Sequence, residues 1–229
     1  MPARTAYHDD LGDHFARHAA DSPYNAYVDR PAMLDLAGDV TGAKILDVGC
    51  GAGHYTAELL DRGAEVVGVD GSAALIRHAR ARTGGRADLR LHDLEEPLDL
   101  PDGAFDGALC ALVLHHITRR AQLLGELRRV LRPGGWLLIS TTHPTADWVH
   151  FGDSYFTDEW VDLPVGGPLS IHYQRATLEM FLTEVLSAGF VLERLIEPVP
   201  VPSLREVDPA AYEKLTRRPS FVGVRLLRL

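Results

Sequence analysis

The sequence predicts an α/β fold in which helices cover both faces of a mostly parallel β-sheet. Three observations predict it. Short apolar runs alternate with segments of helical spacing over most of the chain. A glycine-rich turn at residues 49–53 follows the first of these runs. Polar residues follow several later runs at the point where each one stops, as expected where parallel strands deliver functional groups to one edge of a sheet.

Length and composition indicate one globular domain, residues 1–229. Hydrophobic residues make up 46% of the chain and charged residues 24%, which is typical of proteins with a full apolar core. The formal net charge of −9 argues against nucleic acid and against an anionic membrane surface as partners. Residues 1–10 lack the apolar segment of a signal peptide, and Cys50 and Cys110 lack metal-site or CxxC spacing, so we expect a reduced, cytoplasmic protein.

The central part of the chain alternates predicted strands and helices. Gly63 follows the first predicted helix at the position where helices favour a left-handed residue. The valine-rich strand after it ends at Asp70, and Ser72 is the expected N-cap of the next helix. The expected strands are 44–48, 65–69, 87–92, 105–112 and 136–140, and the expected helices are 54–61, 72–82 and 119–131.

Different patterns flank this core. Residues 5–37 predict one or two amphipathic helices, broken at Pro23 and Pro31, and residues 143–173 are long, aromatic and irregular. The alternation then resumes with a helix at 176–188, a strand at 190–196, a short helix at 209–216 and a last strand at 221–227. We therefore divide the domain into an N-terminal helical lid (1–40), a core (41–142), a cap insertion (143–174) and the rest of the sheet (175–229).

The turn after the first strand predicts a ligand site. Gly49, Gly51 and Gly53 leave the backbone bare, so that a ligand can approach a helix N-terminus closely. A dinucleotide fingerprint would place its third glycine where this chain has His54. Asp47 at the strand end suits a ligand with a cationic or hydrogen-bond-donating group instead.

Two further acids follow the next two strands. Asp70 can accept both hydroxyls of a ribose, and its alternative role is an N-terminal cap for the helix that starts after Ser72. Asp93 can accept a hydrogen bond from an adenine amine, and its alternative is a solvated turn before Glu95 and Glu96. Ribose recognition of this kind occurs in more than one nucleotide-binding family.

Four ordered segments resemble the class I S-adenosylmethionine-dependent methyltransferases of the small-molecule, ubiquinone-related type. ILDVGCGAGHYT resembles motif I, and VVGVDGS resembles the acidic motif after it. LHDLEEPLDLPDGAFDGALCALVLHHI resembles the adenine loop with the fourth strand, and LRRVLRPGGWLLIS resembles the helix, turn and fifth strand that follow. Together the segments span residues 40–142 in the order and spacing of the family, which is much more specific than a single glycine turn.

The resemblance implies a Rossmann-like sheet of seven strands in the order 3-2-1-4-5-7-6, with the last strand antiparallel. It also implies S-adenosyl-L-methionine as cofactor and methyl transfer to an O, N or C atom of a small aromatic or hydrophobic metabolite, as in secondary metabolism. Tyr24 would contact the cofactor from the lid, unless its helix only packs on the sheet. The other implied cofactor residues are Asp47, Gly49, Cys50, Gly51, Gly53, Asp70, Gly71, Ser72, Asp93, Leu94, Cys110 and His115.

Two other classes of function stay open. An enzyme of the same fold can bind the cofactor for a reaction that transfers no methyl group, because the cofactor motif would serve both. An NAD-binding oxidoreductase or a nucleotide sensor is the second class, and the missing glycine at position 54 and the acid at Asp47 count against it.

His143 is the candidate catalytic residue. Methyl transfer from a sulfonium requires alignment, exclusion of water and, for a hydroxyl or amine acceptor, a group that takes a proton. His143 ends the fifth strand before Pro144, and a histidine pKa near ~6.5 suits a base. Its alternative is a structural turn or a substrate-orienting role. Of His115 and His116, at most one is expected to face the cofactor, and no zinc spacing joins them to His143, so we expect no metal.

The aromatic cap insertion supplies the candidate substrate residues. Its rings would wall an apolar pocket over the methyl group, or else pack on each other or on a second subunit, in which case the protein would be a homodimer. The substrate candidates are Trp148, Tyr155, Trp160 and His172. Five acids argue against a strongly anionic acceptor: Asp147, Asp153, Asp158, Glu159 and Asp162.

Overall fold

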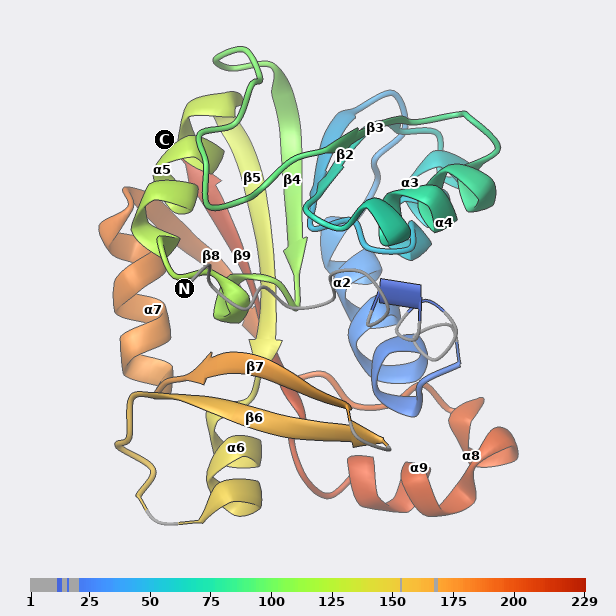
Figure 1. Cartoon of the computed structure of the whole chain (residues 1–229), viewed down its shortest axis with the longest axis vertical. Helices are drawn as coiled ribbons and strands as arrows, with labels where there is room; N and C mark the ends of the chain where they lie inside the picture. Colours follow the sequence, from blue (N-terminus) through green and yellow to red (C-terminus); the bar gives the residue numbers. More distant parts are fainter. Residues whose placement is uncertain (1–11, 14–15, 17–20, 153, 167–168) are drawn as a thin grey trace.

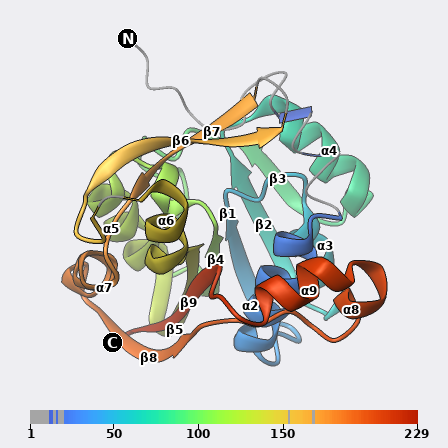
Figure 2. The ribbon, with the colours of Figure 1, turned by 90° about the horizontal axis from the view of Figure 1, so that it is seen from below.

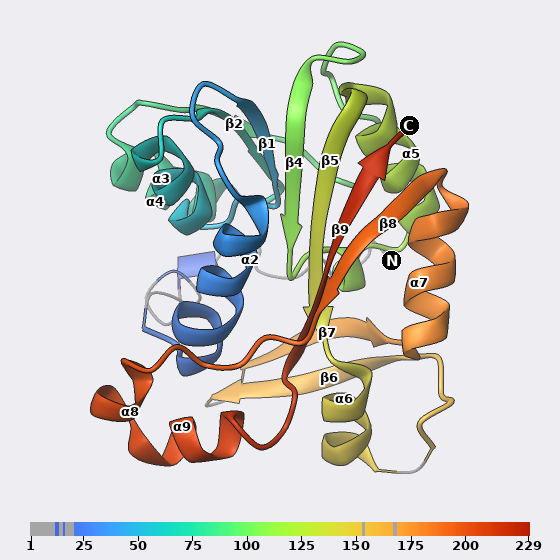
Figure 3. The same ribbon diagram turned by 180° about the vertical axis from the view of Figure 1, so that it is seen from behind.

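The computed structural model describes residues 12–13, 16, 21–152, 154–166 and 169–229. Its centre is a 7-stranded sheet in the order β3-β2-β1-β4-β5-β9-β8 (Figure 1). β1 pairs in parallel with β2 and β4, whereas β9 runs antiparallel between β5 and β8 (Figure 3). The predicted order 3-2-1-4-5-7-6 is therefore confirmed. The strands are β1 (Lys44–Val48), β2 (Glu65–Asp70), β3 (Asp88–Leu91), β4 (Phe105–Ala111), β5 (Leu131–Thr142), β8 (Phe190–Ile196) and β9 (Phe221–Arg228).

Helices cover both faces of this sheet. Ile45 of β1 packs in an apolar cluster with residues of α2 (Arg30–Ala37) and α3 (His54–Asp61). Its neighbour Leu46 belongs to a second cluster, with residues of α5 (Arg120–Val130) and α7 (Leu178–Ser187). Adjacent strand residues point to opposite faces, so β1 is buried on both sides and its apolar residues do not alternate with exposed ones.

Local capping explains the helix boundaries near the site. α4 (Ala73–Thr83) begins where Ser72 Oγ accepts a hydrogen bond from the Leu75 N–H at 3.3 Å, and it ends at Gly84, whose φ is 60°. α7 begins in the same way, with Thr177 Oγ1 accepting from the Met180 N–H at 3.1 Å. Ser72 is thus the N-cap that the sequence predicts.

The described part of the N-terminal segment differs from the prediction. Helical residues run from Pro23 into α2 through a π-helical stretch, η1 (Asn25–Asp29), and Pro31 lies in the first turn of α2. The predicted break at Pro31 is therefore wrong. A proline is tolerated in a first turn because the N–H that it lacks has no partner there. The rest of the predicted lid lies largely outside the described residues.

The insertion after β5 has regular structure, which corrects the prediction of an irregular segment. It contains α6 (Pro144–Phe151) and an antiparallel hairpin of β6 (Glu159–Gly166) and β7 (Leu169–Arg175), which form a separate 2-stranded sheet. Short aromatic-rich strands outside the main sheet do not continue the alternation of strands and helices. Their sequence therefore resembles that of a loop. The short helix α8 (Leu204–Val207) before α9 (Pro209–Leu215) is also absent from the prediction, since its four residues show no period.

The carboxyl ends of the parallel strands meet at one edge of the sheet. Figure 2 looks onto this edge and shows the β6–β7 hairpin and α6 on one side of it, with α8 and α9 on the other. These elements surround the place where the strands deliver their polar residues. Across the described ranges, no helix is long and apolar enough to cross a membrane.

Candidate active site

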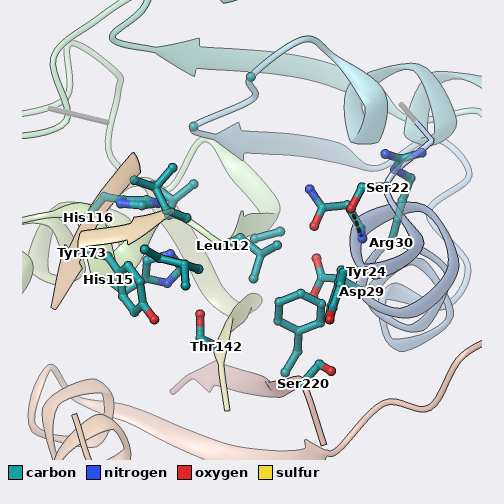
Figure 4. Close-up of a pocket in the computed structure, with 18 of the residues that line it drawn as sticks. Ser22, Tyr24, Asp29, Arg30, Leu112, His115, His116, Thr142, Tyr173 and Ser220 are labelled. Carbon is teal, nitrogen blue, oxygen red and sulfur yellow. Dashed lines mark hydrogen bonds between the residues drawn. The ribbon is translucent and has the colours of Figure 1, made fainter. Parts of the chain in front are cut away.

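A cavity of about 1280 Å³ opens at the carboxyl edge of the sheet. The glycine turn, the residues after β2 and β4, the N-terminal segment, the cap and α9 all contribute to its wall. Figure 4 shows Asp29 and Arg30 on one side, His115 and Tyr173 on the opposite side, and Leu112 between them. The cavity therefore has two chemically different ends.

The glycine turn forms one wall of the cavity. Gly49 and Gly53 adopt left-handed backbone conformations, with φ of 68° and 77°. A Cβ added at Gly49 would lie 2.4 Å from Cγ2 of Val113, and one at Gly53 would lie 2.9 Å from the Cα of Ala79. Glycine is thus required at both positions by conformation and by close packing, which keeps the turn flat against the cavity.

Asp70 lies beside this turn and is held by two backbone donors. Its Oδ2 accepts from the Gly51 N–H at 2.9 Å, and its Oδ1 accepts from the Ser72 N–H at 2.8 Å. These two bonds fix the carboxylate in the cavity wall, and an ionised carboxylate is a strong acceptor for ligand hydroxyls. Asp93 and Leu94 line the adjoining wall.

A cationic group lies at the N-terminal side of the cavity. Arg30 and His54 line it beside the start of α3. Burial, with help from Arg30 and Arg82, lowers the pKa of His54 to about 3, so its imidazole is neutral at pH 7. A guanidinium next to a helix N-terminus favours a carboxylate ligand.

Asp29 lies next to Arg30 in the same wall. Its Oδ2 accepts from the Tyr55 hydroxyl at 2.5 Å, whereas its buried Oδ1 has no hydrogen-bond partner among the described residues. Burial raises the pKa of Asp29 to about 6. Our sequence reasoning missed Asp29 and Arg30; the available signal was a charged pair inside an otherwise apolar helical pattern.

Two histidines and a tyrosine–aspartate pair form the opposite end. The Tyr173 hydroxyl donates to Asp147 Oδ1 at 2.6 Å, and the ring of His115 packs edge-on against Tyr173 at 5.3 Å. His116 Nδ1 donates to the carbonyl oxygen of His172 at 2.9 Å, which fixes its tautomer. His115 Nδ1 lies 2.9 Å from Thr141 Oγ1.

Burial sets the protonation of this end. It lowers the pKa of His115 well below the usual range and that of His116 to about 4, so both rings are neutral at pH 7. Burial also raises the pKa of Asp147 to about 6, against the opposing effect of the Tyr173 hydrogen bond. Asp147 is therefore mostly ionised at neutral pH, and it is a stronger base than His115 or His116.

Comparisons with known proteins agree with this geometry. The family model described as "Methyltransferase domain" matches residues 46–139. A ubiquinone biosynthesis O-methyltransferase of Xanthomonas oryzae pv. oryzae is 31% identical over 157 residues, covering 63% of this chain and 66% of that protein. A protein of Mycolicibacterium smegmatis, named as a probable S-adenosylmethionine-dependent methyltransferase, is 33% identical over 174 residues, covering 76% and 62%.

The chain belongs to the class I S-adenosylmethionine-dependent methyltransferases. The resemblance drawn from the four motif segments is thereby confirmed. The fold agrees, since a crystal structure of an S-adenosylmethionine-dependent methyltransferase from Mesorhizobium loti superposes with a TM-score of 0.70 at 25% identity, covering 92% of this chain and 100% of that one. The chain spans slightly less than two thirds of the length of the two curated relatives.

Most of the predicted cofactor residues of this methyltransferase line the cavity, but three do not. Asp47 lies buried under the turn, where its Oδ2 accepts from Thr56 Oγ1 at 2.5 Å. Gly53 packs on α4, and Cys110 is fully buried in β4. The predicted residues in the wall are Tyr24, Gly49, Cys50, Gly51, Asp70, Gly71, Ser72, Asp93, Leu94 and His115.

The position of His143 argues against the predicted role of base. Its Nδ1 accepts from the Thr145 N–H at 3.1 Å and thereby caps α6, and its Nε2 lies 2.9 Å from Glu197 Oε1. It is buried outside the cavity wall. Both ring nitrogens are engaged where β5 meets the cap, so the geometry favours the structural role that was the alternative, and the role of base stays a prediction.

The predicted substrate residues also lie outside the cavity. Trp160 stacks on His172 with ring centroids 5.0 Å apart, and Trp148 packs edge-on against Tyr155 at 6.4 Å. Alternation along the hairpin explains this for Trp160 and His172, because their neighbours in the strands point inward instead. Trp148 belongs to α6, and Tyr155 precedes β6. The cap residues in the wall are Thr145, Ala146, Asp147, Val149, His150, Leu163, Pro164, Ile171 and Tyr173. Within the described ranges, no three His, Cys, Asp or Glu side chains are grouped to hold a metal ion.

Proposed function

We propose that this chain transfers a methyl group from S-adenosylmethionine to an O, N or C atom of a small metabolite with an apolar body. The observation that carries the proposal is the single cavity with two different ends. Arg30 lies at one end, and His115 and Tyr173 lie at the other (Figure 4). The glycine turn and Asp70 belong to the same cavity wall, and Asp147 accepts from the Tyr173 hydroxyl at the second end. Nucleoside and amino-acid groups suit the first end, and an acceptor suits the second.

The residues at the first end fit the cofactor. Asp70 would hold the ribose hydroxyls, Asp93 the adenine amine, and Arg30 the α-carboxylate. The buried, unpartnered Oδ1 of Asp29 suits the ammonium group of the same amino acid. Bound there, the cofactor supplies an electrophilic methyl group on a sulfonium.

The residues at the second end would position the acceptor and exclude water. Leu163, Pro164 and Ile171 present apolar side chains of the hairpin to the cavity. His115 orients the polar atom of the acceptor as a neutral imidazole. For a hydroxyl or amine acceptor, Asp147 takes the proton, since it lies in the wall and its raised pKa of about 6 makes it a better base than an ordinary carboxylate.

The name of the Xanthomonas relative directs the first test toward hydroxyl acceptors. The protein would be incubated with S-adenosylmethionine and a panel of phenols, catechols, aliphatic alcohols and aromatic amines. Release of S-adenosylhomocysteine together with a product heavier by one CH₂ unit would support methyl transfer. Conversion of the substrate into a product of the same mass would identify a reaction in which the cofactor is not consumed.

A binding experiment tests the cofactor separately. S-adenosylhomocysteine at 100 times its Kd should stabilise the protein by about 2.7 kcal/mol, which a thermal shift detects readily. NAD is the matched control ligand. Stabilisation by NAD and none by S-adenosylhomocysteine would refute the proposal.

A further inference from the structure

A cationic corner lies in the cavity wall at the end of α9. Lys214, Arg217 and Arg218 all line the cavity, in a chain whose formal net charge is −9. They come from the last turn of α9 and the segment that leads into β9, so the fold places them at the mouth beside Ser220 and Phe221. We call these three residues the α9 corner.

The α9 corner has few carboxylate partners among the described residues. Lys214 Nζ donates to the hydroxyl of Tyr24 at 2.8 Å, which orients the ammonium without neutralising it. Neither Lys214 nor Arg218 has an ion pair within 4.0 Å in the described part of the chain. Arg217 pairs with Glu213 at 2.9 Å, but both side chains are about 70% exposed (73% and 67%), so that pair is weak and easily exchanged.

The acids of the cavity wall have neighbours other than the α9 corner. Asp93 accepts from the Glu95 N–H, and Asp29 accepts from the Tyr55 hydroxyl and lies next to Arg30. Asp70 accepts from the backbone of Gly51 and Ser72. Glu95 accepts from the N–H groups of Thr118 and Arg119, and Asp147 accepts from a tyrosine hydroxyl. The positive charge of the α9 corner is thus left for a ligand.

The acids of the cap do not oppose this charge. Asp158 accepts from Gln174, Glu159 pairs with Arg175, and Asp162 lies 3.1 Å from the ring of His172. Of the five acids that the sequence analysis counted against an anionic acceptor, Asp147 lines the cavity, these three do not, and Asp153 lies outside the described residues. The charge of the cap therefore does not exclude an anionic acceptor.

We infer that the acceptor carries an anionic oxygen group, a carboxylate or a phosphate, which the α9 corner binds at the cavity mouth. Three flexible cations at the mouth and the apolar hairpin residues Leu163, Pro164 and Ile171 suit an amphiphilic molecule, with its apolar body under the cap and its charged end at the mouth. The inference rests on the proposed methyl transfer, since it assigns the charged end of the same acceptor.

The test uses matched probes on the full chain saturated with S-adenosylhomocysteine. The probes are hydroxybenzoic and hydroxyphenylacetic acids, the neutral methyl ester of each, and phenyl phosphate, with Kd measured by calorimetry. We expect the anionic probes to bind about 10- to 100-fold more tightly than the esters, as charge-assisted hydrogen bonds imply. A preference for carboxylates over phenyl phosphate, or the reverse, identifies the group. Equal affinities of acids and esters, or no binding by any acid at millimolar concentration, would overturn the inference.

Two variants locate the effect. Arg217→Gln with Arg218→Gln should abolish the preference for anions, because the amides keep hydrogen-bond donors and lose the charge. Arg86→Gln with Arg194→Gln makes the same change of net charge at two arginines outside the cavity wall and should keep the preference. The affinity for S-adenosylhomocysteine should be unchanged in both.

A preference that survives in the first variant overturns the inference, as does a loss of cofactor affinity, which would show that the corner holds the carboxylate of the cofactor. Failure of the wild-type protein to bind S-adenosylhomocysteine would instead count against the proposed function.

Discussion

The hydroxyl of Tyr173 donates a 2.6 Å hydrogen bond to Oδ1 of Asp147, joining the cap hairpin to α6 inside the cavity. Both residues are buried, at 1% and 5% exposure, so this bond is one of few interactions that stabilise the ionised carboxylate. Burial raises the pKa of Asp147 to about 6, against the opposing effects of this hydrogen bond and of the Arg175 charge. The pair therefore couples the folding of the cap to the basicity of the acceptor end.

Removing the tyrosine hydroxyl should shift the pH dependence of methyl transfer. If Asp147 takes the acceptor proton, kcat/KM rises with pH through about 6 as the carboxylate ionises. Tyr173→Phe leaves that carboxylate without its donor, which raises its pKa. The pH at which kcat/KM rises should therefore increase by about 1 pH unit. The measurement is a pH–rate profile with an acceptor found in the methylation panel. Tyr155→Phe makes the same change outside the cavity, and a profile that shifts equally in both variants would contradict the role of the pair.

Asp147 and His143 should differ in their effects on turnover. Asp147→Asn removes the proposed base and should lower kcat by ~10²–10⁴ for a hydroxyl acceptor. His143→Ala removes the cap of α6 and should cost about 1 kcal/mol of stability, while kcat per folded molecule stays near that of the wild type. Denaturant unfolding and steady-state kinetics on the same preparations separate the two. A large loss of kcat in the stable fraction of His143→Ala would restore His143 as the base.

The sequence predicts the core of this protein well because its strands are buried on both faces. The short apolar run of β1 before Asp47, the glycines with positive φ and the capping serine of α4 are local signals, and each one leads to its element. The sheet order is not local, and it followed from the family resemblance. Asp70 was identified because a strand end and a nearby helix start fix its place.

The sequence predicts the acceptor end poorly because that end depends on orientation. In the hairpin, His172 and Tyr173 are adjacent, and only the strand register decides that Tyr173 faces the cavity. His143 stands at the expected strand end, but its ring turns back to cap α6. Lys214 and Tyr24 are 190 residues apart, and no local pattern brings them together.

The ribose site predicts a loss of cofactor affinity on removing one carboxylate. Asp70→Ala should weaken the binding of S-adenosylhomocysteine by roughly 1.5–3 kcal/mol, the range of hydrogen bonds to charged groups. Part of this loss would come from the glycine turn, since the Gly51 N–H loses its acceptor as well. Calorimetry gives the change in Kd, and Asp88→Ala, an exposed acid at the start of β3, is the control. Equal affinity in wild type and Asp70→Ala would refute the ribose role.

The buried Asp47 predicts how stability depends on pH. Burial raises the pKa of Asp47 from 3.8 to about 7, so the folded state holds a proton that the unfolded chain has released. Stability from this group is then greatest below pH 4 and falls as the pH rises toward 7, since the folded state binds more protons throughout that window.

Asp47→Asn keeps an oxygen for the hydrogen bond from Thr56 and removes the charge. The variant should therefore gain stability relative to the wild type as the pH rises, by an amount of the order of 1–4 kcal/mol between pH 4.5 and 8. Urea unfolding over this range measures the difference between the two curves, in which the similar contributions of Asp29 and Asp147 largely cancel. Asp61→Asn, an exposed acid of α3, should give a curve nearly parallel to that of the wild type. If the curve for Asp47→Asn is also parallel to that of the wild type, the pKa of the Asp47 carboxyl is not raised in the folded protein.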